Sequence, residues 1–171
     1  FLVGRENILV ELLGTTSIAT DTPDFWRRPL MQHPEHAGRF SGEPGYFYHV
    51  STAAKKIMKD LKMKPKDFDY CIFHTPNEKF PKIIAKSLGF TSQQLETSLV
   101  VRKIGNTYAA ASLMALSAVL DVAKKNQIIL MVSYGSGSGS DAFVFKTTSL
   151  LEKRRKGWNR FLKDQINDLK E

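Results

Sequence analysis

The stretch KIGNTYAAASLMALSAVLDVA, residues 103–123, is the feature that most constrains the fold. After Thr107 it consists almost entirely of alanine, leucine, methionine, serine and valine, so a helix built from it would be apolar on every side. Such a helix has to be covered by other parts of a protein. Its most apolar part, residues 108–120, is too short to cross a membrane and is interrupted by serines. The sequence therefore predicts a buried central helix over residues 106–124.

The rest of the chain alternates between strand-like and helix-like segments. The continuous apolar run in residues 127–135 is typical of a strand inside a sheet that is covered on both faces. Residues 20–42 hold three prolines and form a long irregular segment, and long ordered loops are often functional. The alternation predicts an α/β layer fold. One predicted strand ends at about Ala19, and others cover 69–74, 127–135 and 141–148. Helices are predicted over 43–61 and 106–124, a loop and a helix that ends at Gly89 over 75–90, and a helical turn within 91–99.

The charge balance bears on the class of partner, because lysine and arginine give the 171 residues a net charge of +8. The lysine-rich run 55–66 is interpreted as a solvated helix face, and more cations cluster at 79–86 and 152–160. Basic surfaces attract nucleic acid, anionic membranes or phosphorylated ligands. The sequence has no RGG run, no aromatic–basic interleaving and no helix-turn-helix or zinc-finger pattern. We therefore expect no nucleic-acid or membrane partner and favour a phosphorylated ligand.

Cys71 is the single cysteine, which excludes an internal disulfide, and no Cys/His cluster has the spacing of a metal site. We therefore expect no metal and a reducing, cytoplasmic location. Cys71 is not a good nucleophile candidate, because residues three apart on a strand point to opposite faces and lie about 10 Å apart, too far for His74 to activate it. A lone cysteine in an apolar strand is interpreted as a small buried hydrophobic residue.

Three polar features stand where an α/β fold places its sites, at the ends of strands or helices. They are His74, Asn106 and the turn GSGSGS, residues 135–140. An imidazole can act as acid or base, an amide can donate to a carbonyl oxygen, and backbone N–H groups in a glycine turn can stabilise an oxyanion. Together these groups would polarise a thioester or an ester, although a nucleophile is missing.

Each of the three features also has a structural explanation. Asn106 can cap a helix, because its side chain can accept a hydrogen bond from a backbone N–H. The glycine–serine turn can be a flexible linker, and a histidine at the end of a strand can be purely structural. The order and spacing of the three features, more than any one of them, indicate a site.

The segments FHTPNEKFP (73–81), IGNTYAAASL (104–113) and VSYGSGSGSDAF (132–143) resemble the carboxyl-terminal half of the thiolase superfamily. The second segment is similar to a motif shared by ketoacyl synthase III-type condensing enzymes and hydroxymethylglutaryl-CoA (HMG-CoA) synthases. The other two, with DFWRR and HAGRFSGEPGYFYHV, are closer to the archaeal-type HMG-CoA synthase family. The resemblance covers about residues 1–146. It implies the carboxyl-terminal half of a thiolase-like layered αβαβα fold over residues 1–148.

Residues 149–171 match no motif of that family. Their apolar residues recur at helical spacing, which predicts an amphipathic carboxyl-terminal helix that docks on another surface. These apolar residues are Trp158, Phe161, Leu162, Ile166 and Leu169.

The resemblance implies a condensing acyltransferase of the mevalonate pathway to isoprenoids. In that family a cysteine takes the acetyl group from acetyl-CoA, and a glutamate assists attack by the acetyl methyl carbon on the ketone of acetoacetyl-CoA. Hydrolysis then releases HMG-CoA. The CoA thioesters are substrates, and no other cofactor is implied. The cysteine and the glutamate belong to the family's amino-terminal half and have no match in this chain, so we expect a fragment or one subunit of a split enzyme.

The resemblance also implies roles for individual residues. His74 matches the catalytic histidine, and Asn106 matches the asparagine that holds the acyl carbonyl groups. The backbone N–H of Ser136 matches an oxyanion contributor, flanked by Gly135 and Gly137 in the substrate-binding turn. Lys79 matches a position that helps to hold a CoA phosphate. Glu78 departs from the family, because a small residue is expected there.

Other expectations come from the family alone: a homodimer, and association with acetoacetyl-CoA thiolase through a zinc-ribbon/OB-fold protein. Two alternatives remain open. The first is a ketoacyl-ACP synthase III-like enzyme, which usually has His-Gln-Ala-Asn where this chain has His-Thr-Pro-Asn from His74. The second is a non-catalytic thiolase-fold module that serves as a scaffold for a partner.

Overall fold

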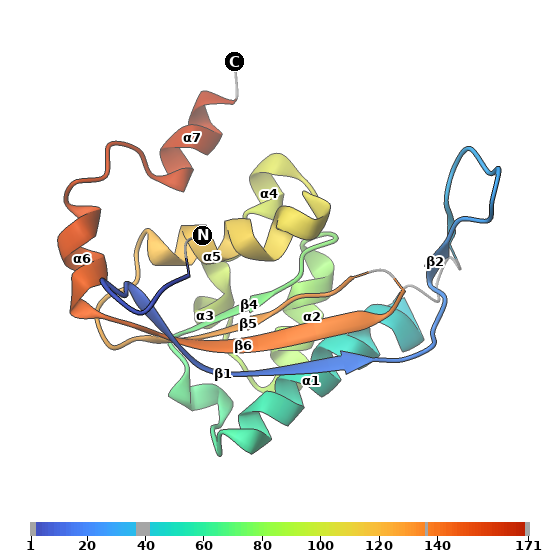
Figure 1. Cartoon of the computed structure of the whole chain (residues 1–171), viewed down its shortest axis with the longest axis horizontal. Helices are drawn as coiled ribbons and strands as arrows, with labels where there is room; N and C mark the ends of the chain where they lie inside the picture. Colours follow the sequence, from blue (N-terminus) through green and yellow to red (C-terminus); the bar gives the residue numbers. More distant parts are fainter. Residues whose placement is uncertain (1–2, 37–41, 136, 170–171) are drawn as a thin grey trace.

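The computed structural model describes residues 3–36, 42–135 and 137–169 and consists of one main sheet with helices on both faces (Figure 1). The four strands lie in the order β1-β6-β5-β4. β4 and β5 are parallel, and β6 is antiparallel to both of its neighbours. This arrangement confirms the α/β prediction. The strands are β1 (Val10–Ala19), β4 (Tyr70–Phe73), β5 (Ile128–Val132) and β6 (Gly139–Thr147).

The helices form a layer on each face of the sheet. α1, α2 and α3 cover one face, and α5 and α6 cover the other (Figure 1). The helices are α1 (Phe47–Asp60), α2 (Lys79–Leu88), α3 (Ser92–Glu96), α4 (Val101–Ile104), α5 (Ala111–Leu120), α6 (Ser149–Arg155) and α7 (Leu162–Asp168). Short helical turns occur at Gly42–Tyr46, Pro65–Asp67 and Tyr108–Ala110.

β5 is buried on both faces, as its apolar run predicts. Leu130 and Val132 belong to the core on the α1 side, whereas Ile129 and Met131 belong to the core on the α5 side. Successive side chains of a strand point to opposite faces, so one apolar strand contributes to two cores. Because β4 and β5 are parallel neighbours, both strands end at the same edge of the sheet.

α1 shows how the sequence determines the layer it joins. Val50, Ala53, Ala54 and Ile57 recur at helical spacing and are all buried against the sheet. The lysines between them are exposed, which confirms the solvated helix face predicted for the start of the run 55–66. α2 ends at Gly89 as predicted, because Gly89 adopts a left-handed conformation with φ of 88°.

The predicted buried helix over 106–124 is wrong at its beginning and in part of its burial. α4 ends at Ile104, and Gly105 has φ of 73° and ψ of −167°, a conformation that is essentially restricted to glycine and stops a helix. The regular helix begins only at Ala111. Leu113 is 45% exposed and Val122 49% exposed, so the described chain does not cover the segment on every side.

The irregular segment predicted for 20–42 forms an arm that projects from the body of the molecule (Figure 1). Its residues up to 36 contain a short antiparallel hairpin, β2 (Phe25–Trp26) with β3 (Glu35–His36), while residues 37–41 lie outside the described part. The Trp26 Nε1–H donates to Glu35 Oε2 at 2.9 Å across this hairpin.

The prediction of one helix in the tail is also wrong, because two short helices replace it. α6 ends at Arg155, and the chain turns through Gly157 before α7 begins at Leu162. The tail docks on α5 and the loop after it. Leu151 is fully buried in the α5-side core, Arg155 donates to the carbonyl oxygens of Leu120 and Ala123, and the Leu162 N–H donates to Asp121.

We predict that Leu151→Ala lowers the free energy of unfolding by about 2–5 kcal/mol, because it removes a buried side chain and leaves a cavity. Urea denaturation measures the change. Leu150→Ala is the matched control, since Leu150 is the adjacent residue of α6 and is only partly buried. Equal losses in the two variants would contradict the docking of the tail.

Candidate functional site

His74 follows β4 directly and lies at the edge where β4 and β5 end. Its backbone N–H donates to the carbonyl oxygen of Val132 at 2.9 Å, which continues the pairing of the two strands by one residue. The Tyr46 hydroxyl donates to the carbonyl oxygen of His74 at 2.6 Å. The main chain at His74 is therefore fixed from two sides, by the neighbouring strand and by the residue that precedes α1.

His74 is only 8% exposed, and burial lowers the pKa of its imidazole from 6.5 to about 4. The imidazole is therefore neutral at pH 7, with one nitrogen that can donate and one that can accept. Among the described residues, no side chain hydrogen-bonds to its ring. The Tyr134 ring lies 6.4 Å away between centroids. A neutral imidazole with a free donor and acceptor is able to exchange hydrogen bonds with a ligand.

Asn106 lies in the exposed connection between α4 and the turn before α5. Its Oδ1 accepts a hydrogen bond from the Tyr108 N–H at 2.8 Å, so the side chain does stabilise a local turn. This bond uses only the oxygen. The Nδ2 amino group has no acceptor within the described chain and remains able to donate. The structural explanation and the binding explanation of Asn106 are therefore compatible.

The glycine–serine turn joins β5 to β6 as a hairpin. Gly135 and Gly139 exchange backbone hydrogen bonds of 2.8 and 3.1 Å, so the Gly135 N–H is used inside the turn. The Gly137 N–H donates to Asp24 Oδ1 at 2.6 Å, and Gly137 has φ of 88°, which favours glycine. Ser136, the predicted oxyanion contributor, lies outside the described residues. The substrate-binding roles of the three residues stay predictions.

Asp24 is a residue of this region that the site prediction missed. It is 1% exposed and accepts three hydrogen bonds: from the Tyr134 hydroxyl at 2.5 Å, from the Gly137 N–H and from the Phe25 N–H at 2.8 Å. A buried carboxylate is costly unless donors surround it, and these three donors stabilise it. Asp24 thereby ties the base of the arm to the glycine hairpin. The only sequence signal was its place in the segment DFWRR, which gave no role.

His49 supports the same region from α1. Its Nδ1 lies 2.7 Å from the carbonyl oxygen of Gly45, which can only accept, so Nδ1 carries the hydrogen. In the neutral ring Nε2 then accepts from the Thr20 hydroxyl at 2.8 Å. The Ser138 hydroxyl donates to the Thr22 carbonyl oxygen at 2.7 Å. These bonds join α1, the start of the arm and the hairpin into one hydrogen-bonded unit.

Lys79, predicted to contact a CoA phosphate, is exposed at the beginning of α2. Glu78 does not neutralise it, because the Glu78 carboxylate pairs with Lys82 and with Arg102, whose Nε lies 2.8 Å from Oε1. Lys79 makes no ion pair within the described chain. Its ammonium group is therefore available to an anionic ligand.

Cys71 is confirmed as a buried hydrophobic residue. It is fully buried in the α1-side core, and burial raises the pKa of its thiol. In the described part of the chain no group of three His, Cys, Asp or Glu side chains could hold a metal ion. Likewise, none of the described helices is long and apolar enough to cross a membrane.

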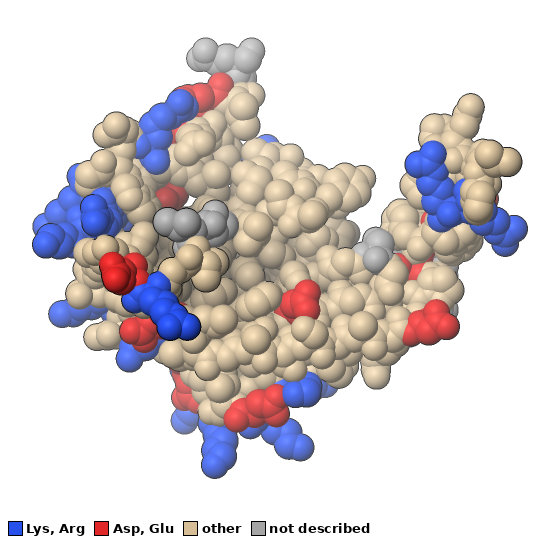
Figure 2. Space-filling view, in the orientation of Figure 1, with Lys and Arg blue, Asp and Glu red and all other residues tan. Residues whose placement is uncertain are grey.

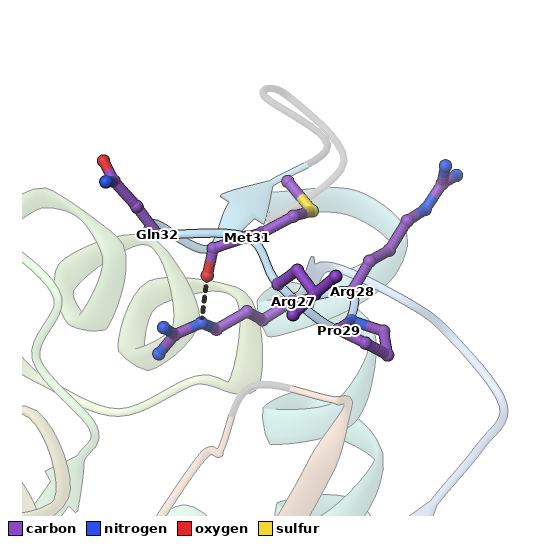
Figure 3. A pocket seen from close by; sticks show the side chains of 6 residues that line it. Arg27, Arg28, Pro29, Met31 and Gln32 are labelled. Carbon is purple, nitrogen blue, oxygen red and sulfur yellow. Dashed lines mark hydrogen bonds between the residues drawn. The ribbon is translucent and has the colours of Figure 1, made fainter.

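Two further surface features lie apart from His74 and Asn106. A hollow of about 530 Å³ on the arm is lined by six consecutive residues from Arg27 to Gln32 (Figure 3). Arg27 Nε donates to the Met31 carbonyl oxygen at 2.8 Å, whereas Arg28 points away from it (Figure 3). Cationic side chains also gather over α6, which holds part of the predicted basic cluster 152–160 (Figure 2).

We predict that acid destabilises the protein through His74. Its pKa is lower in the folded state than in the unfolded state, so the unfolded state binds more protons below pH 6.5. Stability that is complete above pH 6.5 is lost as the pH falls through about 4, by about 3 kcal/mol. Urea denaturation at pH 7 and pH 4 should show a smaller acid loss for His74→Asn than for the exposed-site control His33→Asn. Identical acid losses in the two variants would exclude this effect.

Comparisons with known proteins bear on this arrangement. Residues 58–147 match the family described as "3-Oxoacyl-[acyl-carrier-protein (ACP)] synthase III C terminal". Hydroxymethylglutaryl-CoA synthase of Methanopyrus kandleri is 50% identical over 155 residues, which cover 91% of this chain and 44% of that protein. The Thermoplasma acidophilum enzyme of the same name is 45% identical over 170 residues, covering 99% and 48%. The chain thus spans about half the length of these curated relatives.

Solved structures show the same fold at much lower identity. 3-Oxoacyl-[acyl-carrier-protein] synthase III from Aquifex aeolicus VF5 superposes with a TM-score of 0.72 at 19% identity. The match covers 83% of this chain and 46% of the Aquifex chain. An HMG-CoA synthase complexed with CoA gives 0.73 at 20% identity, covering 93% and 47%. These matches confirm the prediction of a thiolase-like carboxyl-terminal half. The chain belongs to the family of 3-oxoacyl-ACP synthase III carboxyl-terminal domains.

Proposed function

We propose that this chain is the carboxyl-terminal half of an HMG-CoA synthase, which condenses acetyl-CoA with acetoacetyl-CoA to HMG-CoA. The observation that carries the proposal is the identity of about 50% to curated HMG-CoA synthases over nine-tenths of the chain. The placement of a neutral, buried His74 and of Asn106 with a free amide group supports it. The acyltransferase activity would require the amino-terminal half, on the same or on a separate chain.

His74 would act as a hydrogen-bonding and proton-exchanging group next to the reacting carbonyl. Because burial keeps the imidazole neutral, it can donate to a thioester or ketone oxygen without bringing a full positive charge to the site. Its fixed main chain limits how far the ring can move. The catalytic cysteine and the glutamate would come from the amino-terminal half.

Asn106 would donate its Nδ2–H to an acyl carbonyl oxygen. The bond from the Tyr108 N–H to Oδ1 fixes the orientation of the amide, which directs the amino group away from the turn. A donor whose orientation is already fixed loses little conformational entropy when it binds. It is most effective where negative charge develops on the carbonyl oxygen. Asp24 would position the glycine hairpin that includes Ser136, through the Gly137 N–H.

Exposed apolar side chains in and beside α5 support the need for a second half. Tyr108 is 76% exposed, and Leu113 and Val122 are also open on the described chain. Another part of the protein can cover exposed apolar side chains such as these. In this proposal the amino-terminal half covers them and brings its cysteine to the region of Asn106.

The remaining partners are part of the proposal. Acetyl-CoA and acetoacetyl-CoA would bind with a phosphate near Lys79, whose ammonium group is unpaired in the described chain. A homodimer, an acetoacetyl-CoA thiolase and a zinc-ribbon/OB-fold scaffold protein are predictions from the family alone. A cytoplasmic location is a prediction from the single cysteine.

We predict that His74→Ala in the complete enzyme abolishes condensation, measured as acetyl-CoA-dependent loss of acetoacetyl-CoA absorbance. His33→Ala, at an exposed histidine of the arm, is the control and should retain activity. Near-normal turnover by His74→Ala would falsify the role of His74 and weaken the proposal as a whole.

Asn106→Asp separates the two roles of Asn106. Aspartate keeps an oxygen for the Tyr108 N–H but loses the donating amino group, so we expect the turn to persist and kcat to fall about 10²–10³-fold. Steady-state kinetics with both substrates measures the loss, and the melting temperature reports the turn. Normal kcat with a lower melting temperature would mean that Asn106 is only structural.

A ketoacyl-ACP synthase III activity is the second candidate, favoured by the family to which residues 58–147 belong. The two activities differ in the acceptor. Condensation with acetoacetyl-CoA but not with malonyl-ACP supports the first proposal, and the reverse preference supports the second.

A further inference from the structure

The loop that carries Asn106 runs between two short helical elements. α4 has only four residues, and the turn before α5 has three. Between them Gly105 and Tyr108 both have positive φ, of 73° and 52°, and most residues from 101 to 110 are exposed. Local hydrogen bonds fix the turns of this loop, and its position relative to His74 depends on contacts with other segments.

Arg102 provides such an anchor. It lies four residues before Asn106, and its Nε is 2.8 Å from Oε1 of Glu78, which lies four residues after His74. The other guanidinium nitrogens contact both carboxylate oxygens of Glu96, at the end of α3, and Nη2 is 3.2 Å from Oε2. One side chain thus joins the loop of His74, the loop of Asn106 and α3.

The geometry of the contacts suits a positioning role better than a stabilising one. The side chains of Arg102 and Glu78 are 33% and 39% exposed, and ion pairs that water reaches contribute little to the free energy of folding. A guanidinium that binds two carboxylates through separate nitrogens nevertheless fixes direction as well as distance, which a lysine cannot do.

The charges around the pair are balanced. Glu78 also pairs with Lys82, and Arg102 also pairs with Glu96, so two acids and two bases form one chain of contacts. This pairing lowers the pKa of Glu78 and raises that of Arg102, so both stay charged near neutral pH. Both acidic partners of Arg102 occupy its guanidinium group, so it has little left to attract an anion, in contrast to Lys79, the chain neighbour of Glu78.

We propose that Arg102 is a positioning residue, which holds the Asn106 loop against the His74 loop through Glu78. The proposal rests on the proposed function, because it assigns Arg102 the task of aligning two groups that act on the same acyl carbonyl. A misplaced donor weakens catalysis more than binding, since small displacements of an aligned group are costly in the transition state.

Arg102→Gln in the complete enzyme tests the proposal, with Lys103→Gln as the matched control. Lys103 is the next residue of α4, is exposed and makes no ion pair within the described chain. We expect Arg102→Gln to lower kcat about tenfold or more with the KM for either CoA substrate changed less than about twofold. Arg102→Lys keeps the positive charge but loses the planar guanidinium group. Its kcat should therefore lie between those of Arg102→Gln and the wild-type enzyme.

A raised KM with unchanged kcat in Arg102→Gln would overturn the proposal and indicate direct phosphate binding. Kinetics equal to those of Lys103→Gln would overturn it as well. Hydrogen–deuterium exchange gives a readout that does not depend on activity: the amides of residues 103–108 should exchange faster in Arg102→Gln than in Lys103→Gln. If the wild-type enzyme condenses no substrate, the proposed function fails, and the exchange result still decides whether Arg102 anchors the loop.

Discussion

The burial of β5 on both faces is the constraint on which the rest of the structure depends. A strand of uninterrupted apolar residues requires helices on both sides, and α1, α2 and α5 meet this requirement. Because β4 is parallel to β5, the two strands end at the same edge. His74 and the glycine hairpin are thereby brought to one place, although more than fifty residues separate them in the chain.

At that edge, polar groups replace the apolar packing, and the groups that surround the His74 imidazole have defined hydrogen-bond partners. Asp24 accepts three hydrogen bonds, His49 is hydrogen-bonded to both Thr20 and Gly45, and the Tyr46 hydroxyl fixes the main chain of His74. Buried polar networks of this kind specify one arrangement, because any slip leaves a polar group without its partner. These hydrogen bonds fix the main chain of His74 and the glycine hairpin, and burial makes the imidazole of His74 neutral.

The described chain covers the α5 segment only in part. The side towards the sheet is a close-packed core, whereas Leu113, Val122 and Tyr108 remain open. This asymmetry agrees with a chain that spans about half of its curated relatives. Catalysis under the proposed function therefore depends on an interface as much as on the residues of this half, and the Arg102 contacts set one of the loops that would face it.

The sequence by itself determined the elements whose periodicity is strong: α1 with its apolar stripe, β5 with its continuous run, and the end of α2 at Gly89. It also determined His74 and Asn106 as candidates, through motif order. Only the tertiary structure decided that the helix begins at Ala111, that the tail breaks into α6 and α7, and that Asp24 and Arg102 belong to the region of the site. The physical reason is the sequence separation of the contacts involved. Periodicity reports contacts within a few residues, whereas these features depend on a glycine conformation and on hydrogen bonds or ion pairs between distant segments.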